Sequence, residues 1–115
     1  MRVSMSKDHG RTWSAPRNWS GSASTASSPW VGFRDDRNVD VLWYQGLAAP
    51  VTLVLSRGPA DGYPTQRAVV AVVQPMGGRS AGNTDYAHFA RLRDGRVIAV
   101  WCESSVFASV EARAR

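Results

Sequence analysis

Residues 6–13 read Ser-Lys-Asp-His-Gly-Arg-Thr-Trp, and this stretch decides the fold. Asp8 can accept hydrogen bonds from backbone N–H groups of its own turn, and Gly10 supplies a positive φ that other residues resist. Thr12 and Trp13 are then predicted to resume a strand, in which the indole buries a large apolar area against a neighbouring sheet. The stretch therefore predicts a β-hairpin closed by a hydrogen-bonded turn.

The rest of the chain also reads as strands, because short alternating or β-branched runs are separated by turn residues. No segment has sustained helical periodicity, so the expected fold class is all-β. In the run Val39-Asp-Val-Leu-Trp43, the side chains of Val39, Val41 and Trp43 are expected to share one face. The predicted strands cover residues 2–6, 30–34, 39–45, 51–56, 67–74, 87–93, 96–102 and 106–110.

The connections are predicted from composition. Residues 20–28 are rich in Ser and Ala and are expected to be a surface link, and residues 75–84 are expected to be a long loop. Residues 56–64 keep a Ser and an Asp-Gly pair at the place where a second copy of the 6–13 pattern would fall. The spacing there is wrong for a true copy, so we interpret that turn as a degenerate one.

The pattern Ser-x-Asp-x-Gly-x-Thr-Trp, carried by Ser6, Asp8, Gly10, Thr12 and Trp13, resembles the Asp-box (BNR repeat) of the sialidase (neuraminidase) superfamily and related β-propellers. The resemblance implies a partial six-bladed propeller made of four-stranded antiparallel blades. Residues 1–20 would end one blade with the Asp-box, residues 29–74 would form a complete blade, and residues 85–115 would start the next.

About two blades of strands cannot close a ring, because propellers need about four to eight blades. Two explanations stay open. The chain is a fragment of a longer propeller, or chains of two blades close as a symmetric trimer in which the half-blades at the two ends pair between subunits.

The resemblance also implies a chemistry. Active members of the superfamily cleave terminal sialic acid from glycans with a tyrosine nucleophile, a glutamate partner, an aspartate acid/base and three arginines that hold the substrate carboxylate. By this resemblance Tyr86 would be the nucleophile, Glu103 its partner and Arg34 a clamp arginine. The alternatives are an ordinary packed tyrosine, a surface carboxylate and a turn arginine paired with Asp35 and Asp36. The chain offers no R-I-P motif for the first arginine and no assignable acid/base aspartate.

The function expected from the resemblance is that of a fragment of an exo-sialidase-type glycoside hydrolase, inactive alone, with a glycan or sialoside ligand and no cofactor. The alternative is a non-catalytic propeller that binds carbohydrate or acts as a protein-interaction scaffold. Three convergent arginines would favour the enzyme. A carbohydrate-binding protein needs only aromatic platforms and polar groups.

Composition narrows the classes of partner and site that the chain can have. The chain has 115 residues, 43% hydrophobic and 20% charged, which is typical of a globular protein, and its net charge is +5. Its arginines are scattered without a basic block, so we expect no nucleic-acid partner, while anionic glycans would still be attracted. The single Cys102, expected to be buried in a strand, excludes an intrachain disulfide, and His9 and His88 lie far apart, so we expect no metal.

No apolar run reaches the roughly 18 residues that a membrane span needs, so we expect no membrane partner. Residues 1–6 do not resemble a signal peptide, although members of the superfamily are often exported. Localisation therefore stays open.

Overall fold

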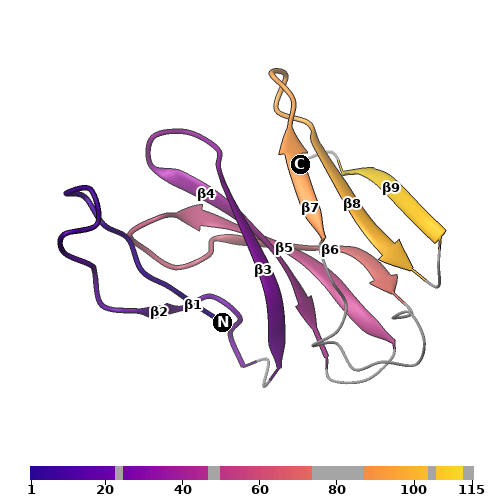
Figure 1. Ribbon diagram of the computed structural model, residues 1–115, viewed down its shortest axis with the longest axis horizontal. Coiled ribbons are helices and arrows are strands. Elements are labelled where there is room, and N and C mark those ends of the chain that lie inside the picture. The colour runs from indigo at the N-terminus through magenta and orange to yellow at the C-terminus, as the bar shows by residue number, and fades with distance from the viewer. Residues whose placement is uncertain (23–24, 47–49, 74–86, 104–105, 113–115) are drawn as a thin grey trace.

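The computed structural model describes residues 1–22, 25–46, 50–73, 87–103 and 106–112, with the side chains of residues up to 101. These residues form nine strands in three antiparallel sheets, and none of them is helical (Figure 1). The all-β class predicted from the sequence is therefore confirmed, including one sheet of four strands in chain order. The six-bladed propeller stays a prediction.

The three sheets follow one another along the chain. The first pairs β1 (Arg2–Val3) with β2 (Arg17–Asn18), on either side of the 6–13 loop. The second is a meander of β3 (Ala26–Phe33), β4 (Asn38–Gln45), β5 (Val51–Pro59) and β6 (Gln66–Val73). The third has β7 (His88–Arg91), β8 (Val97–Glu103) and β9 (Val106–Ala112), again in chain order.

The four-stranded sheet is apolar on both faces because β4 and β5 alternate two sets of buried side chains. Val39, Val41 and Trp43 share one face, as predicted, and pack with Trp19 and the first sheet. The opposite face packs against the third sheet, in a cluster of Leu42, Tyr44, Val51, Leu53, Leu55, Val73, Ala87, Val97, Ala99 and Trp101. The middle sheet thus lies between the other two, which Figure 1 shows as three successive layers.

The second and third sheets approach closely at β3 and β7. A Cβ atom on Gly32 would lie 2.7 Å from the ring of Phe89, so only glycine leaves room for that ring. Nearby, two positions before Gly32 and one before Phe89, the rings of Trp30 and His88 lie with their centroids 4.1 Å apart. Side-chain contacts therefore join β3 to β7, although no ladder of hydrogen bonds pairs them.

The first hairpin differs from the prediction. The strand expected over residues 2–6 covers only Arg2–Val3, and Thr12 and Trp13 lie outside any strand. Pro16 has no N–H group to donate to a ladder, so pairing resumes only after it, at Arg17. The Asp-box loop is consequently longer than a tight hairpin turn.

Two strands of the middle sheet are longer than predicted. β3 begins at Ala26, inside the Ser/Ala-rich stretch expected to be a link, and its ladder with β4 is irregular between Ser27 and Trp30. β5 continues past Ser56 to Pro59, because its pairing with β4 runs on to Asn38. Residues 56–64 therefore contain the end of β5 and the turn to β6. The predicted loop over residues 75–84 lies outside the described residues.

Candidate functional site

The Asp-box loop is closed by hydrogen bonds among its own residues. Asp8 Oδ1 accepts from the N–H of Thr12 at 2.8 Å, and Asp8 Oδ2 accepts from the Thr12 hydroxyl at 2.6 Å. The hydroxyl of Ser6 donates to Asp8 Oδ1 and accepts from the N–H of Gly10. The backbone φ is +59° at His9 and +86° at Gly10, so the chain reverses through two left-handed residues. The predicted turn closure by Asp8 is confirmed.

These donors favour the ionised form of Asp8. The Thr12 hydroxyl contributes most, the Thr12 N–H next, and the Ser6 hydroxyl adds to them, so that the pKa of Asp8 falls to about 2. The carboxylate is therefore committed to holding the loop and is not available as a proton donor near neutral pH.

Trp13 does not bury its indole as predicted. Its side chain is 64% exposed, and its Nε1 donates to the carbonyl of Gly10 at 3.1 Å. The indole closes over its own loop because no strand begins at Trp13 to direct it towards a sheet. Trp19 is the buried indole of this region instead: it is fully enclosed and donates from Nε1 to the carbonyl of Gly62 at 3.0 Å.

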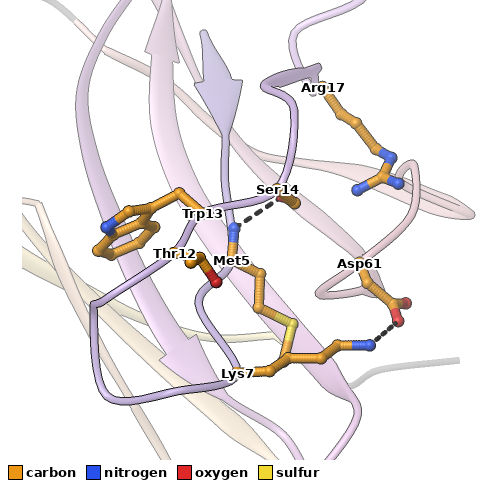
Figure 2. A pocket seen from close by; sticks show the side chains of 7 residues that line it. All are labelled: Met5, Lys7, Thr12, Trp13, Ser14, Arg17 and Asp61. Atoms are coloured by element: carbon orange, nitrogen blue, oxygen red, sulfur yellow. Dashed lines mark hydrogen bonds and ion pairs between the residues drawn. The ribbon is translucent and has the colours of Figure 1, made fainter.

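A pocket of about 380 Å³ lies between the Asp-box loop and the turn after β5 (Figure 2). Lys7 and Asp61 span it with an ion pair of 3.1 Å between Nζ and Oδ2. The lining side chains come from the first hairpin and that turn: Met5, Lys7, Thr12, Trp13, Ser14, Arg17 and Asp61.

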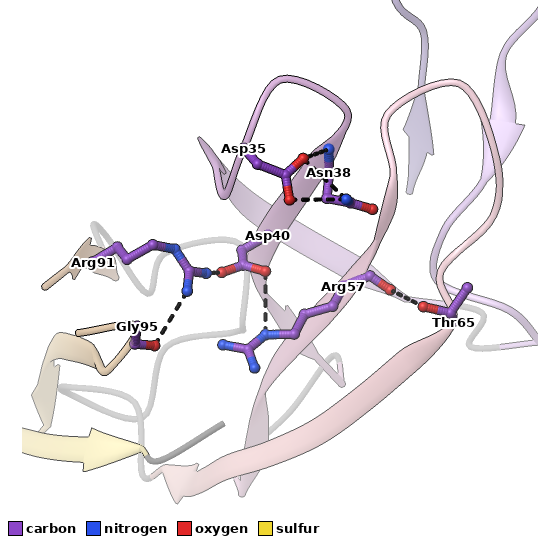
Figure 3. Close-up of polar contacts among 7 residues, drawn as sticks. All are labelled: Asp35, Asn38, Asp40, Arg57, Thr65, Arg91 and Gly95. Atoms are coloured by element: carbon purple, nitrogen blue, oxygen red, sulfur yellow. Dashed lines mark hydrogen bonds and ion pairs between the residues drawn. The ribbon is translucent and has the colours of Figure 1, made fainter. Parts of the chain in front are cut away.

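A second polar cluster lies on the opposite face of the middle sheet, around Asp40 of β4 (Figure 3). Asp40 is fully buried, and Arg57 stands directly opposite it on β5, with Nε 3.2 Å from Asp40 Oδ1. Arg91 of β7 reaches Asp40 Oδ2 with Nη2 and donates from Nη1 to the carbonyl of Gly95. One buried carboxylate thus pairs with Arg57 of its own sheet and, through Arg91, connects the second and third sheets.

Arg34, the predicted clamp residue, lies within electrostatic reach of this cluster. Burial, and then the positive charge of Arg34, lower the pKa of both Arg57 and Arg91. Arginine nevertheless stays protonated in proteins, so Arg57 and Arg91 face Asp40 as two cations, and the charge of Arg34 acts on both of them. Arg34 itself is exposed at the end of β3, where its N–H donates to the carbonyl of Asn38.

The alternative role for Arg34, a turn arginine paired with Asp35 and Asp36, stays open: no ion pair among the described residues includes Arg34, but its positive charge is one of the causes that lower the pKa of Asp35. Asp35 is bonded within its own turn. It accepts from the N–H groups of Arg37 and Asn38, both at 2.8 Å, and from the Asn38 amide. The Arg37 N–H is the largest of the effects that lower the pKa of Asp35.

The structure does not bring Arg34 and Glu103 together. Val97 of β8 pairs with Arg91, and Glu103 lies six residues further along the same strand. At about 3.3 Å per residue, the two ends of β8 are about 20 Å apart. Arg34, close to Arg91, therefore lies at the other end of the third sheet from Glu103. Tyr86 lies outside the described residues, and its role as nucleophile and that of Glu103 as partner stay predictions.

The remaining candidates are Cys102 and a metal site. Cys102 lies in β8, as expected, with a side chain outside the described set. Within the described residues, no three histidine, cysteine or carboxylate side chains gather where they could hold a metal ion. The same part of the chain contains no helix long and apolar enough to cross a membrane.

Sequence reasoning missed Asp40, Arg57 and Arg91. The available signal was a charge inside an apolar run: Asp40 stands between Val39 and Val41, and Arg57 follows an apolar strand. A buried charge needs a partner, so Asp40 required cations from elsewhere. Which cations would meet it depends on strand register and sheet packing, which no local pattern gives.

No protein-family model, curated protein or solved structure matches this chain. The resemblance to Asp-box propellers therefore rests on Ser6–Trp13 and on the strand pattern.

Proposed function

We propose that this chain is part of the β-propeller of a sialidase-like glycoside hydrolase, and that by itself it binds an acidic sugar without cleaving it. The Asp-box loop with its internal hydrogen bonds and the four-stranded meander between two further sheets support the propeller. Exo-sialidase activity is proposed for the complete propeller on the strength of the family resemblance.

The acidic ligand is proposed from Arg34, whose positive charge lowers the pKa of both Arg57 and Arg91 and therefore acts within electrostatic reach of them. Arginine binds carboxylates through charge-assisted and often bidentate hydrogen bonds, so a group of arginines suits the carboxylate of sialic acid. Asp40 neutralises one of the two arginines that it pairs with, and the negative charge of Asp35 also acts on Arg91. Arg34 is the member exposed to solvent, and we assign it the direct contact with the ligand.

The absence of turnover follows from distance. A nucleophile or proton-transfer group acts only within hydrogen-bond reach of the reacting atoms. Glu103 lies about 20 Å along β8 from the strand position that pairs with Arg91, so it cannot act on a sugar held at Arg34.

Titration with the methyl α-glycoside of sialic acid tests this proposal. Arg34→Ala should weaken binding about tenfold or more, the value of one charge-assisted hydrogen bond of about 1.5–3 kcal/mol. Arg37→Ala is the matched control, because Arg37 is an exposed arginine of the same turn. It donates to Asp35 from its backbone N–H, which the substitution keeps. Equal affinities for Arg34→Ala and Arg37→Ala would overturn the assignment.

A fluorogenic sialoside tests the catalytic part. The isolated chain should give no turnover. Turnover that disappears in Tyr86→Phe would contradict this expectation and would assign the nucleophile to Tyr86. Turnover that survives both Tyr86→Phe and Arg34→Ala would contradict every residue role carried over from the family.

A protein-interaction scaffold is the second candidate, because β3 exposes large apolar side chains, with Val31 and Phe33 on one face and Trp30 on the other. Trp30 is 42%, Val31 58% and Phe33 74% exposed on this edge strand. Exposed apolar patches mark interaction surfaces. A variant with Val31→Thr and Phe33→Thr that keeps sialoside affinity but becomes less prone to self-associate in light scattering would favour this candidate as an additional role.

A further inference from the structure

The pocket beside the Asp-box loop is separate from the arginine cluster. The cluster lies on the face of the middle sheet that packs against β7, whereas the pocket lies between the first hairpin and the β5–β6 turn. A ligand in the pocket would therefore touch neither Arg34 nor Asp40. An inference about the pocket stands independently of the proposed function.

The walls of the pocket are held in place before any ligand arrives. Asp8 fixes Thr12 through two hydrogen bonds, and Trp13 is tied to the carbonyl of Gly10. Met5 and Ser14 bond to each other twice, with the Ser14 N–H donating to the Met5 carbonyl at 2.9 Å and the Met5 N–H donating to the Ser14 hydroxyl at 3.0 Å. Of the lining side chains, the entropic cost of ordering on binding therefore falls mainly on Lys7 and Arg17.

The pocket carries more positive than negative charge. Lys7 pairs with Asp61, and this contact is the largest of the effects that lower the pKa of Asp61. Arg17 approaches Asp61 from the other side and lowers its pKa further (Figure 2). Among the described residues, the Arg17 guanidinium makes no hydrogen bond or ion pair, so its donors are available to a ligand.

An anionic ligand can replace Asp61 as the partner of Lys7. Its side chains are 69% and 55% exposed, and exposed ion pairs of this kind contribute little to stability. Lys7 can therefore turn from Asp61 to an incoming anion without loss to the fold, which would place a second cation beside Arg17.

The opposite side of the pocket is aromatic. Trp13 lines the pocket on the side away from Arg17 and Asp61, with Met5 and Lys7 between them in Figure 2, and the residue is 64% exposed. An indole face binds the apolar face of a pyranose ring, while a guanidinium binds a carboxylate in a bidentate manner. The volume of about 380 Å³ falls at the small end of ligand pockets.

We propose that this pocket binds an acidic pyranose, a uronic acid residue, with its carboxylate on Arg17 and its ring against Trp13. Nothing in the Asp-box pattern itself requires Arg17 or Asp61, so the pocket adds a binding role to a structural motif. The protein would then hold an acidic glycan at a position separate from Arg34.

The test is an NMR titration with methyl β-D-glucuronide, performed in the Arg34→Ala variant so that the arginine cluster cannot contribute. The indole N–H signal of Trp13, assigned with Trp13→Phe, reports the pocket. We expect a saturable shift with a Kd on the order of 1 mM. Methyl β-D-glucoside, which lacks only the carboxylate, should bind about tenfold more weakly.

Arg17→Gln should weaken glucuronide binding about tenfold, and Arg11→Gln, an exposed arginine of the same loop outside the pocket lining, should leave it unchanged. Lys7→Gln is the second variant if Arg17→Gln fails to fold, and it should weaken binding severalfold. The proposal is overturned if the Trp13 signal does not saturate, if glucoside binds as well as glucuronide, or if neither cation variant weakens binding. If the pocket does not bind glucuronide, the result of the sialoside titration of Arg34→Ala still stands, so the two proposals are tested separately.

Discussion

Replacing Asp40 by alanine should be among the most damaging single substitutions in this chain. Asp40 is 0% exposed, and the side chains of its partners Arg57 and Arg91 are 8% and 18% exposed. The substitution removes the carboxylate that both guanidinium groups face and leaves two buried positive charges repelling each other. Removing one partner of a buried ion pair costs about 3–5 kcal/mol, because the remaining charge is desolvated without compensation.

That cost is large against the total stability of a domain, about 5–15 kcal/mol. For a chain of this length it corresponds to a fall in Tm of about 12–20 °C. Urea unfolding followed by tryptophan fluorescence measures the change in free energy directly. The matched control is Lys7→Ala, which breaks the exposed pair with Asp61 and should leave the midpoint almost unchanged.

A second variant separates the cost of unpaired buried charge from the cost of lost packing. In the triple replacement Asp40→Leu, Arg57→Met, Arg91→Met, the buried charges disappear together, and stability should return to near the wild-type value or above it. If Asp40→Ala unfolds no earlier than Lys7→Ala, the cluster does not hold the sheets together. If the triple replacement is as unstable as Asp40→Ala, the cost lies in cavity formation rather than in unpaired charge.

The remaining predictions concern the loops and the association state. Because the pKa of Asp8 falls from 3.8 to about 2 on folding, its contribution is complete above pH 3.8 and is lost as the pH drops towards about 2; acid titrations of wild type and Asp8→Asn should diverge in this window, and parallel curves would contradict the role of the carboxylate. Gly58→Ala should destabilise the β5–β6 turn by about 1–3 kcal/mol, since its Cβ would lie 2.5 Å from the Tyr63 carbonyl oxygen, and thermal unfolding would reveal it. Light scattering should give the mass of one chain. If the two strands of the first sheet paired with the three of the third between subunits, they would form a sheet of five strands rather than a four-stranded blade. A compact trimer would refute this prediction.

Much of the fold was predictable because strand signals are local. Alternating apolar residues gave β4 within one residue at its start, and the Asp94-Gly95 pair marked the turn before β8. The predicted end of β5 was wrong for an instructive reason. A charged residue, Arg57, follows Ser56 and resembles a strand end, but the partner Asp40 allows β5 to continue with that charge buried.

The prediction that the Trp13 indole is buried was wrong for a similar reason. The Asp-box pattern predicts that Trp13 is buried, yet Trp19 fills the core position against Val41 and Trp43. The direction of an indole depends on where the strand resumes, and Pro16 delays that point beyond Trp13. A short motif fixes its own turn and leaves the following side chains to the packing of the sheets.

The two polar clusters explain why architecture was easier to predict than chemistry. Every hydrogen bond that closes the Asp-box joins residues at most nine positions apart, so the spacing of the sequence alone encodes the geometry. The arginine cluster joins Asp40 to Arg57 through strand pairing and to Arg91 through the packing of two sheets. Its members are scattered in the sequence, and although Asp40 stands out as a charge inside an apolar run, nothing in the sequence links it to Arg57 or Arg91. Ligand recognition on stacked sheets depends on such contacts between distant segments, so a motif that identifies the fold identifies neither the ligand nor the residues that bind it.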